Sequence, residues 1–397
     1  MKIENPTPMQ WQFSDRAQRL HSSVIREILK VTQRPEVISF AGGLPSPLTF
    51  PVERMQAAFD TVLSTNGHVA LQYGPSDGYA PLREWIADSM SIAGATISPD
   101  QVLMVSGSQQ GLDLLGKVLI DEHSKVLVET PSYLGALQAF SLYGPEFVSI
   151  PTDEGGLIPE SVAPLAAGAR LLYALPNFQN PTGRTLSLAR RTALVEICAQ
   201  FGLPLIEDDP YGALSYSAEP LPKMLTMNPR GVVHMGSFSK VLTPGIRLGY
   251  VIAPQPLVRK MEQAKQATDL HTATLTQMVV HEVIKDGFLD QHIPTIRALY
   301  ADQCKAMLDA MAEFFPDGVT WTRPEGGMFI WVTLPEQFDS MMLLDEAIAR
   351  NVAFVPGTPF YANNPVRNTF RLSFVTVSPE KIRQGIEILG TLIAAKI

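Results

Sequence analysis

Short apolar runs separated by helical patterns fill the middle of the chain, from about residue 100 to residue 252. The runs contain few polar positions, as is typical of strands buried on both faces of a sheet. Strands that alternate with helical crossovers predict an α/β fold with a mostly parallel sheet and helices on both faces. The predicted strands cover residues 102–105, 125–128, 147–150, 171–175, 203–206, 232–235 and 248–252.

The pattern changes after residue 252. Two long helical patterns at about 255–285 and 294–315 precede a strand pair, 319–322 and 328–334, around Gly326 and Gly327. A helix, two short strands (352–355 and 369–374) and a closing helix follow. This order predicts a smaller α+β domain at 291–397, after a large domain at 41–290. We expect residues 1–40, with a short amphipathic helix at about 22–31, to pack on the small domain as an N-terminal arm.

Composition narrows the class of protein. The 397 residues, 46% of them hydrophobic, can bury a large core in two lobes. A net charge of −8 without a long basic run argues against a nucleic-acid partner. Cys198 and Cys304 form no disulfide or zinc pattern, which fits a reducing compartment. The N-terminus lacks a signal peptide, and no stretch reaches the ~20 apolar residues of a membrane helix. We expect a cytoplasmic protein without a bound metal or membrane contact.

Lys240 follows the predicted strand at 232–235 directly. Partial desolvation at such a position lowers the pKa of the amine and makes it a nucleophile toward carbonyls. Ser237, Ser239 and Arg247 surround it with donors suited to a phosphate. This combination is what an enzyme that uses pyridoxal phosphate needs. The alternative is a lysine that simply caps a strand end.

Other predicted strands end in groups that suit the same cofactor. Ser108, followed by Gln109, takes the N-cap position of a helix, where an anion binds or where the helix is merely capped. Tyr133 either stacks on a flat heterocycle or packs its own helix. Asn180 lies in a turn and offers a neutral donor to the phenolate oxygen of the cofactor.

Three acids, Glu207, Asp208 and Asp209, end the predicted strand at 203–206. Buried acids are costly unless they have partners. A carboxylate that faces the pyridine nitrogen of pyridoxal phosphate keeps that nitrogen protonated and maintains the ring as an electron sink. A solvated acidic loop is the alternative interpretation.

These motifs, in this order, resemble the fold-type I pyridoxal phosphate aminotransferases. The shared motifs are Ser-Gly-Ser-Gln-Gln at 106–110, Asn-Pro-Thr-Gly at 180–183, Asp-Asp-Pro-Tyr at 208–211, Ser-Phe-Ser-Lys at 237–240 and Arg-Leu-Ser at 371–373. More narrowly, the chain is similar to the 2-aminoadipate/kynurenine aminotransferase subgroup. That likeness rests on Phe-Ala-Gly-Gly-Leu-Pro at 40–45, Leu-Gln-Tyr-Gly at 71–74, Ser-Gly-Ser-Gln-Gln at 106–110, Gly-Gly-Met-Phe at 326–329 and Asn-Val-Ala-Phe-Val-Pro-Gly at 351–357.

The resemblance implies a role for each matching residue. Lys240 would bond to the cofactor aldehyde and move the reacting proton, Asp208 would pair with the pyridinium, and Tyr133 would stack on the ring as a further catalytic residue. Asn180 and Tyr211 would hold the phenolate oxygen. The implied phosphate ligands are Ser108, Gln109, Ser237, Ser239 and Arg247, joined by Tyr73 of the other subunit of a homodimer with shared sites. For Tyr73 the alternative is a buried core tyrosine.

Substrate contacts are implied in the same way. Arg371 would grip the α-carboxylate of the amino acid as a bidentate fork, beside Gly43 and Asn180; the alternative is an arginine that bridges two strands. In the subgroup the N-terminal helix reads the substrate side chain, which makes Arg19, Ser23 and Arg26 candidates. A solvated helix face is the alternative there, so the amino donor stays open among 2-aminoadipate, aromatic and aliphatic amino acids.

The implied activity is a ping-pong transamination from such an amino acid to a 2-oxo acid, with 2-oxoglutarate as the expected acceptor. A β-lyase type of reaction on the same scaffold is the alternative among enzymes. An effector-sensing regulator domain would need a DNA-binding module of ~60 residues before the site motifs. The segment before Gly42 is shorter than that and is not basic.

Overall fold

A seven-stranded sheet forms the centre of the computed structural model, which describes residues 11–20, 28, 34–216 and 220–397. Its order is β2-β10-β9-β8-β7-β3-β4, and all neighbours are parallel except β10, which is antiparallel to both β9 and β2. The predicted, mostly parallel sheet is therefore confirmed. Its strands are β2 (Val102–Val105), β3 (Lys125–Glu129), β4 (Glu146–Ile150), β7 (Ala169–Ala174), β8 (Leu205–Asp208), β9 (Val232–Ser237) and β10 (Gly249–Ile252).

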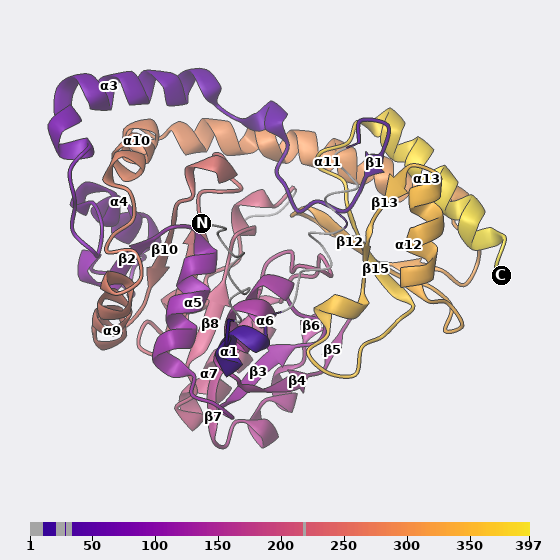
Figure 1. Ribbon diagram of the computed structural model, residues 1–397, viewed down its shortest axis with the longest axis horizontal. Helices are drawn as coiled ribbons and strands as arrows, with labels where there is room; N and C mark the ends of the chain where they lie inside the picture. The colour runs from indigo at the N-terminus through magenta and orange to yellow at the C-terminus, as the bar shows by residue number, and fades with distance from the viewer. Residues whose placement is uncertain (1–10, 21–27, 29–33, 217–219) are drawn as a thin grey trace, which may run out of the picture.

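Both faces of this sheet are buried. Successive residues of a strand point to opposite faces, and the strand side chains divide accordingly between two hydrophobic clusters. On β2, Leu103 and Val105 join one cluster, whereas Val102 and Met104 join the other. Helices surround this sheet (Figure 1), and helical residues join both clusters, such as Leu112 in the first and Leu82 in the second. The helices that begin before residue 290 are α1 (Asp15–Gln18), α3 (Val52–Ala70), α4 (Ala80–Met90), α5 (Ser108–Leu119), α6 (Leu134–Ser141), α7 (Leu188–Phe201), α8 (Met224–Met227), α9 (Gln255–Gln266), α10 (Thr274–Ile284) and α11 (Phe288–Phe314).

A second, four-stranded antiparallel sheet, β11-β12-β15-β14, lies at the C-terminal end of the chain. The long helix α11 runs from the large sheet toward it, and α13 packs on α11. A separate parallel pair joins β1 to β13, which ties residues 38–39 to this part of the molecule. The remaining elements are β1 (Ile38–Ser39), β5 (Thr152–Asp153), β6 (Gly156–Leu157), β11 (Thr320–Trp321), β12 (Phe329–Thr333), α12 (Ser340–Ala349), β13 (Val352–Ala353), β14 (Val355–Pro356), β15 (Thr369–Ser373) and α13 (Pro379–Ala394).

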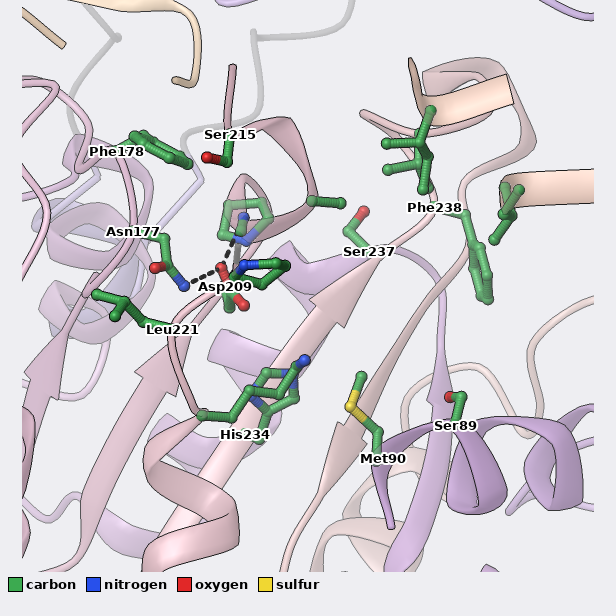
Figure 2. A pocket seen from close by; sticks show the side chains of 18 of the residues that line it. Ser89, Met90, Asn177, Phe178, Asp209, Ser215, Leu221, His234, Ser237 and Phe238 are labelled. Carbon is green, nitrogen blue, oxygen red and sulfur yellow. Dashed lines mark hydrogen bonds between the residues drawn. The ribbon is translucent and has the colours of Figure 1, made fainter. Parts of the chain in front are cut away.

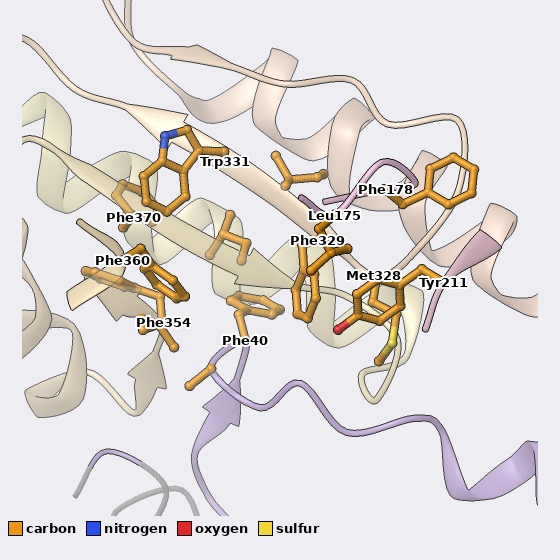
Figure 3. Packing of buried hydrophobic residues seen from close by; sticks show 14 of the residues in the cluster. Phe40, Leu175, Phe178, Tyr211, Met328, Phe329, Trp331, Phe354, Phe360 and Phe370 are labelled. Atoms are coloured by element: carbon orange, nitrogen blue, oxygen red, sulfur yellow. The ribbon is translucent and has the colours of Figure 1, made fainter. Parts of the chain in front are cut away.

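Aromatic side chains fill the core beneath the small sheet, and Phe40 from the N-terminal segment packs among them (Figure 3). The rings of Trp331 and Phe360 meet edge to face, with centroids 5.7 Å apart. This packing ties the segment before residue 43 to strands near the C-terminus. The domain boundaries at 40 and 290 stay predictions.

The helix predictions were wrong in two places. The pattern at 255–285 is two helices, α9 and α10, separated by a turn in which Leu270 has a φ of 68°. Helix α11 begins at Phe288, before the predicted start at 294, and contains Pro294. Proline signals a helix boundary in sequence, but the helix continues through Pro294 here. The predicted helix at 22–31 lies outside the described residues except for Ile28. Among the described helices, none has the length and apolar character needed to cross a membrane.

Candidate active site

A cavity of about 480 Å³ lies beyond the carboxyl ends of the central strands. Open α/β sheets bind ligands at this edge, because loops from several strands converge there. Most of the side chains that the sequence assigns to the cofactor and substrate line this single cavity. They are Gly43, Ser108, Gln109, Tyr133, Asn180, Asp208, Tyr211, Ser237, Ser239, Lys240, Arg247 and Arg371.

Lys240 lies just after β9 and points into the cavity. Its Nζ donates a hydrogen bond of 2.7 Å to the carbonyl oxygen of Gly43. Burial, together with the positive charges of Arg371 and Arg247, lowers the pKa of the Lys240 amine to about 8. More of this amine is therefore uncharged near neutral pH than of an ordinary lysine, and the uncharged form is the nucleophile.

Asp208 ends β8 and carries one uncommitted carboxylate oxygen. Its Oδ2 accepts a hydrogen bond of 2.7 Å from the hydroxyl of Tyr173, whereas Oδ1 is buried and has no partner. Burial raises the pKa of this carboxyl to about 6, although the Tyr173 hydrogen bond opposes the shift. A buried acceptor without a donor is costly, so Oδ1 is suited to a ligand that brings an N–H or a positive charge.

The two acids beside Asp208 have partners within the fold. Glu207 accepts two backbone N–H bonds and contacts Nδ1 of His234 at 3.0 Å. Asp209 accepts from the Asn177 side chain at 2.9 Å and from a backbone N–H (Figure 2). Asp209, Asn177 and His234 line a second cavity of about 450 Å³ behind the first. Of the three acids, Asp208 is the one that lines the cavity with Lys240.

The turn between β2 and α5 has the backbone features of an anion-binding cradle. Gly107 has a φ of 84°, and a Cβ at this position would collide with the guanidinium of Arg247. The sequence places Ser108 at the N-cap, but the structure has Gly107 there and begins α5 at Ser108. The N-cap differs from the prediction because the backbone has a positive φ at this position, and a positive φ favours glycine. The backbone N–H groups of the first turn and the Arg247 charge together favour a phosphate.

Arg371, on β15, reaches the cavity from the small sheet. Its side chain is 2% exposed; one terminal nitrogen donates to Asn180 Oδ1 at 2.8 Å and the other to the carbonyl of Ala41 at 2.7 Å. The guanidinium lies over the Phe329 ring, 4.3 Å from its centroid (Figure 3 shows this ring). Burial lowers the pKa of Arg371 to about 10. Its Nε has no partner, so the buried cation still has a donor for a carboxylate.

Two tyrosines border the same cavity. Tyr133 precedes α6, and burial, with the nearby charge of Asp208, raises the pKa of its hydroxyl to about 12. Burial also raises the pKa of Tyr211, whose ring meets Phe329 edge to face with centroids 5.8 Å apart. Both hydroxyls are therefore protonated at neutral pH and available as hydrogen-bond donors.

The structure does not bring every candidate to this cavity. Tyr73 is 78% exposed and meets the His271 ring edge to face, which excludes the core-tyrosine alternative within this chain. Arg19 forms an ion pair with Glu122 and is absent from the cavity lining, contrary to the predicted placement. The physical reason is that this acid, just after α5, offers Arg19 a counter-charge there. Ser23 and Arg26 lie outside the described residues, and their roles stay predictions.

The sequence analysis did not identify the residues that hold the cavity residues in place through hydrogen bonds. Tyr173 is the hydrogen-bond donor to Asp208, and a tyrosine within an aliphatic buried strand signals such a need for a partner. Glu129, whose pKa burial raises to about 8, accepts from Gln179 at 2.8 Å next to Asn180. Pairings of this kind join different strands, so one stretch of sequence does not reveal them.

Comparison with known proteins identifies the family. The model of the family "Aminotransferase class I and II" matches residues 36–389. The chain is 44% identical to aromatic-amino-acid aminotransferase 1 of Thermococcus litoralis, over 99% of this chain and 96% of that protein. The crystal structure of the α-aminoadipate aminotransferase of Thermus thermophilus, complexed with N-(5'-phosphopyridoxyl)-L-leucine, is 42% identical with a TM-score of 0.90, covering 96% and 97% of the two chains.

A kynurenine aminotransferase of Pyrococcus horikoshii is similar to the same degree. Its crystal structure, in complex with PMP, is 41% identical with a TM-score of 0.92 and covers 97% of each chain. The chain belongs to the class I and II aminotransferase family. It is a fold-type I aminotransferase, an enzyme that moves an amino group between an amino acid and a 2-oxo acid.

Proposed function

We propose that this aminotransferase uses pyridoxal phosphate held by the cavity residues and accepts 2-aminoadipate, aromatic and aliphatic amino acids, with 2-oxoglutarate as the amino acceptor. The observation that carries the cofactor proposal is the buried, unpartnered Oδ1 of Asp208 in the same cavity as the Lys240 amine. The cradle at Gly107, where the positive φ disfavours any other residue and the Arg247 guanidinium lies against the backbone, supports the phosphate end. The residues present therefore fit the cofactor.

When bound, pyridoxal phosphate supplies an aldehyde that condenses with amines and a ring that withdraws electrons from the reacting carbon. Lys240 would be the residue that bonds to that aldehyde, and its amine would carry the proton to and from the substrate Cα. Asp208, through its free Oδ1, would hold the ring nitrogen and keep it charged. Asn180 and Tyr211 would hold the phenolate oxygen, and Tyr133 would hold the ring face.

The phosphate ligands are the second part of the cofactor proposal. Ser108 and Gln109 present the start of α5, while Ser237 and Ser239 add hydroxyls and Arg247 adds a charge. Charge-assisted hydrogen bonds of this kind are stronger than neutral ones. Together they anchor the cofactor at the end remote from the chemistry.

Arg371 orients the substrate in this proposal. Its unpartnered Nε and the spare hydrogens of its terminal nitrogens face an α-carboxylate, while Asn180 and the Ala41 carbonyl fix the guanidinium plane. Gly43 lines the cavity beside Lys240 and leaves room for the amino acid. An α-carboxylate is common to all amino acids, so this contact gives affinity without choosing a side chain.

We propose a broad range of amino donors because the side chains that line the cavity near α6 are partly apolar and partly polar. Leu134 and Phe360 are apolar, whereas Gln138 is polar and exposed. Relatives named for 2-aminoadipate, aromatic amino acids and kynurenine support the same range. Arg26 remains our proposed reader of a distal carboxylate.

The first test is to locate the cofactor bond. The purified protein should be yellow, and borohydride reduction followed by peptide mapping should place the pyridoxyl group on Lys240, because its amine is buried in the cavity and partly uncharged. A panel of amino acids with 2-oxoglutarate, read as glutamate formed, then gives the donor range. A label on another lysine would overturn the cofactor assignment. Products of β-elimination in place of glutamate would favour the β-lyase alternative.

We also propose a homodimer in which Tyr73 of one subunit reaches the cofactor phosphate of the other. The exposed Tyr73 ring and the exposed apolar side chains of Leu48, Val52 and Leu71 support this assembly. A cytoplasmic location, supported by the two free cysteines, belongs to the same proposal.

Mixing two variants tests the shared site. Tyr73→Phe should weaken cofactor binding by about 10–100-fold, the usual effect of one charge-assisted hydrogen bond. Adding excess Lys240→Ala subunits to Tyr73→Phe subunits should restore the activity of the latter, because each hybrid dimer then has one intact site. If mixing restores nothing, or if a dilute monomer is fully active, Tyr73 does not act across the interface.

A further inference from the structure

A hydrogen-bond network behind the phosphate cradle centres on Asp269, in the turn between α9 and α10. Its Oδ1 accepts from Lys265 Nζ at 2.8 Å, and its Oδ2 accepts from Gln110 Nε2 at 2.6 Å and from Ser106 Oγ at 3.3 Å. None of these four side chains lines the active-site cavity. The carboxylate therefore acts on the site only through the residues that it holds.

Lys265 is a buried lysine, so its charge needs a partner within the fold. Its side chain is 0% exposed, and burial lowers the pKa of its amine. Burial alone would raise the pKa of Asp269, but hydrogen bonds from Lys265, Gln110 and Ser106 lower it below its usual value. Leaving the fully buried Lys265 amine without its partner would be strongly unfavourable, although the Asp269 side chain itself is 33% exposed. The ion pair therefore keeps Asp269 ionised and holds its carboxylate in one position.

On one side, Asp269 holds both ends of the cradle turn. Gln110 also accepts from the Ser106 backbone N–H at 2.8 Å through its Oε1, which closes the turn on itself. The Ser106 carbonyl accepts from Arg247 at 3.4 Å. Between these ends lie Gly107, with its positive φ, and Ser108, which begins α5. The position of Asp269 thus sets where the N–H groups of the cradle point.

On the other side, the same turn holds the segment that carries Tyr73. Leu270 takes a positive φ of 68°, which turns the chain directly after Asp269. His271 follows, and its Nε2 accepts from the Gly74 backbone N–H at 3.3 Å. The His271 ring also meets the Tyr73 ring edge to face, with centroids 5.7 Å apart. One short turn therefore contacts both the cradle and the Tyr73 segment.

We propose that Asp269, fixed by buried Lys265, is a positioning residue that sets the phosphate cradle of its own subunit together with the Tyr73 segment offered to the neighbouring subunit. This inference rests on the proposed cofactor and on the proposed role of Tyr73. It adds a structural link between two phosphate contacts that serve different active sites of the dimer.

The test compares two ligands that differ only in the phosphate. In the full-length protein freed of cofactor, Asp269→Asn should raise the dissociation constant of pyridoxal phosphate by about 10–100-fold, as expected when a charge-assisted contact is lost. The dissociation constant of pyridoxal, which lacks the phosphate, should change little. Equal losses for both ligands, or no loss for either, would overturn the proposal.

A matched control is available on α11. Lys305 and Asp309 form an ion pair with the same i,i+4 spacing, but both side chains are well exposed. Asp309→Asn should leave both dissociation constants unchanged. Should Asp269→Asn not fold, Lys265→Met retains the buried volume and should show the same selective loss for pyridoxal phosphate. If the unmodified protein binds neither ligand through Lys240, the proposed cofactor fails instead of this inference.

A double-mutant cycle tests the link to Tyr73. If Asp269 also positions Tyr73, the Tyr73→Phe change should raise the dissociation constant of pyridoxal phosphate less in Asp269→Asn than in the unmodified protein. Equal effects in the two backgrounds would show that the two contacts are independent and would remove the inter-subunit part of the proposal.

Discussion

Lys240→Ala should lower the turnover number by on the order of 10⁴-fold or more, the upper range for one acid–base group, because we propose two roles for this lysine. It is the only amine among the described residues that line the cavity, and burial has already lowered its pKa to about 8. Stopped-flow measurement of a single half-reaction with excess amino acid gives the rate without interference from cofactor exchange. The variant should still bind pyridoxal phosphate through the cradle, without a bond to the protein.

Lys223→Ala is the matched control. Lys223 lines the adjoining cavity, but it does not line the active-site cavity. Its loss should leave the half-reaction rate near that of the unmodified enzyme. Small primary amines added to Lys240→Ala should restore part of the rate, because they replace the missing proton carrier. A Lys240→Ala enzyme of normal speed would rule out the catalytic role of Lys240.

Asp208→Asn should leave cofactor binding largely intact and reduce the rate by more than the ~10²–10⁴-fold typical of one acid–base group. The amide lacks the charge that keeps the ring nitrogen protonated, so the electron sink is lost. The half-reaction rate measures this effect. The absorption spectrum of the bound cofactor should shift at the same time, which a merely structural change would not produce.

Asp209→Asn separates this role from a general effect of charge at the strand end. Asp209 is the next residue, but its Oδ1 accepts from Asn177 and from the Gly212 N–H, and it does not line the cavity with Lys240. Its substitution should change the rate far less. If Asp208→Asn retains near-normal turnover, Glu207 or Asp209 must carry the charge instead.

The same substitution of Asp208 has a predictable effect on stability. Burial raises the Asp208 pKa to about 6, so this carboxyl binds its proton more tightly in the folded chain than in the unfolded chain. The folded state without cofactor therefore loses stability as pH rises from the unfolded pKa through about 6, by about 3 kcal/mol. At pH 7, Asp208→Asn without cofactor should melt no lower than the unmodified protein. A large drop in melting temperature would mean that the charged carboxylate stabilises the fold.

Much of this protein could be predicted from local sequence because its strands are buried on both faces. Continuous apolar runs indicated all seven strands of the central sheet, since a strand covered by helices on each side needs no polar face. The cofactor candidates were recognisable for a related reason. They follow those strands immediately, and the ends of parallel strands share one edge of the sheet.

Predictions from local sequence were wrong where the pattern of polar and apolar residues was compatible with two structures. The break between α9 and α10 falls in a polar stretch that a helix also tolerates, and the break matters because Asp269 and His271 lie in it. Arg19 is polar in any environment, and the acid that attracts it, Glu122, is distant in sequence. Which charged residues meet in such a pair depends on how the helices pack. The pattern of apolar positions does not predict the relative orientation of the helices.

The sequence by itself determined the class of fold and the chemistry, because apolar periodicity and the residue types at strand ends are local properties. The family resemblance assigned the cofactor acid to Asp208, and the tertiary structure supplied the physical reason: hydrogen-bond partners from elsewhere in the fold engage Glu207 and Asp209 and leave one Asp208 oxygen free. It also placed Arg371 beside Asn180, 191 residues away along the chain. Such contacts arise only when the two sheets pack together, because long-range geometry has no counterpart in the local sequence.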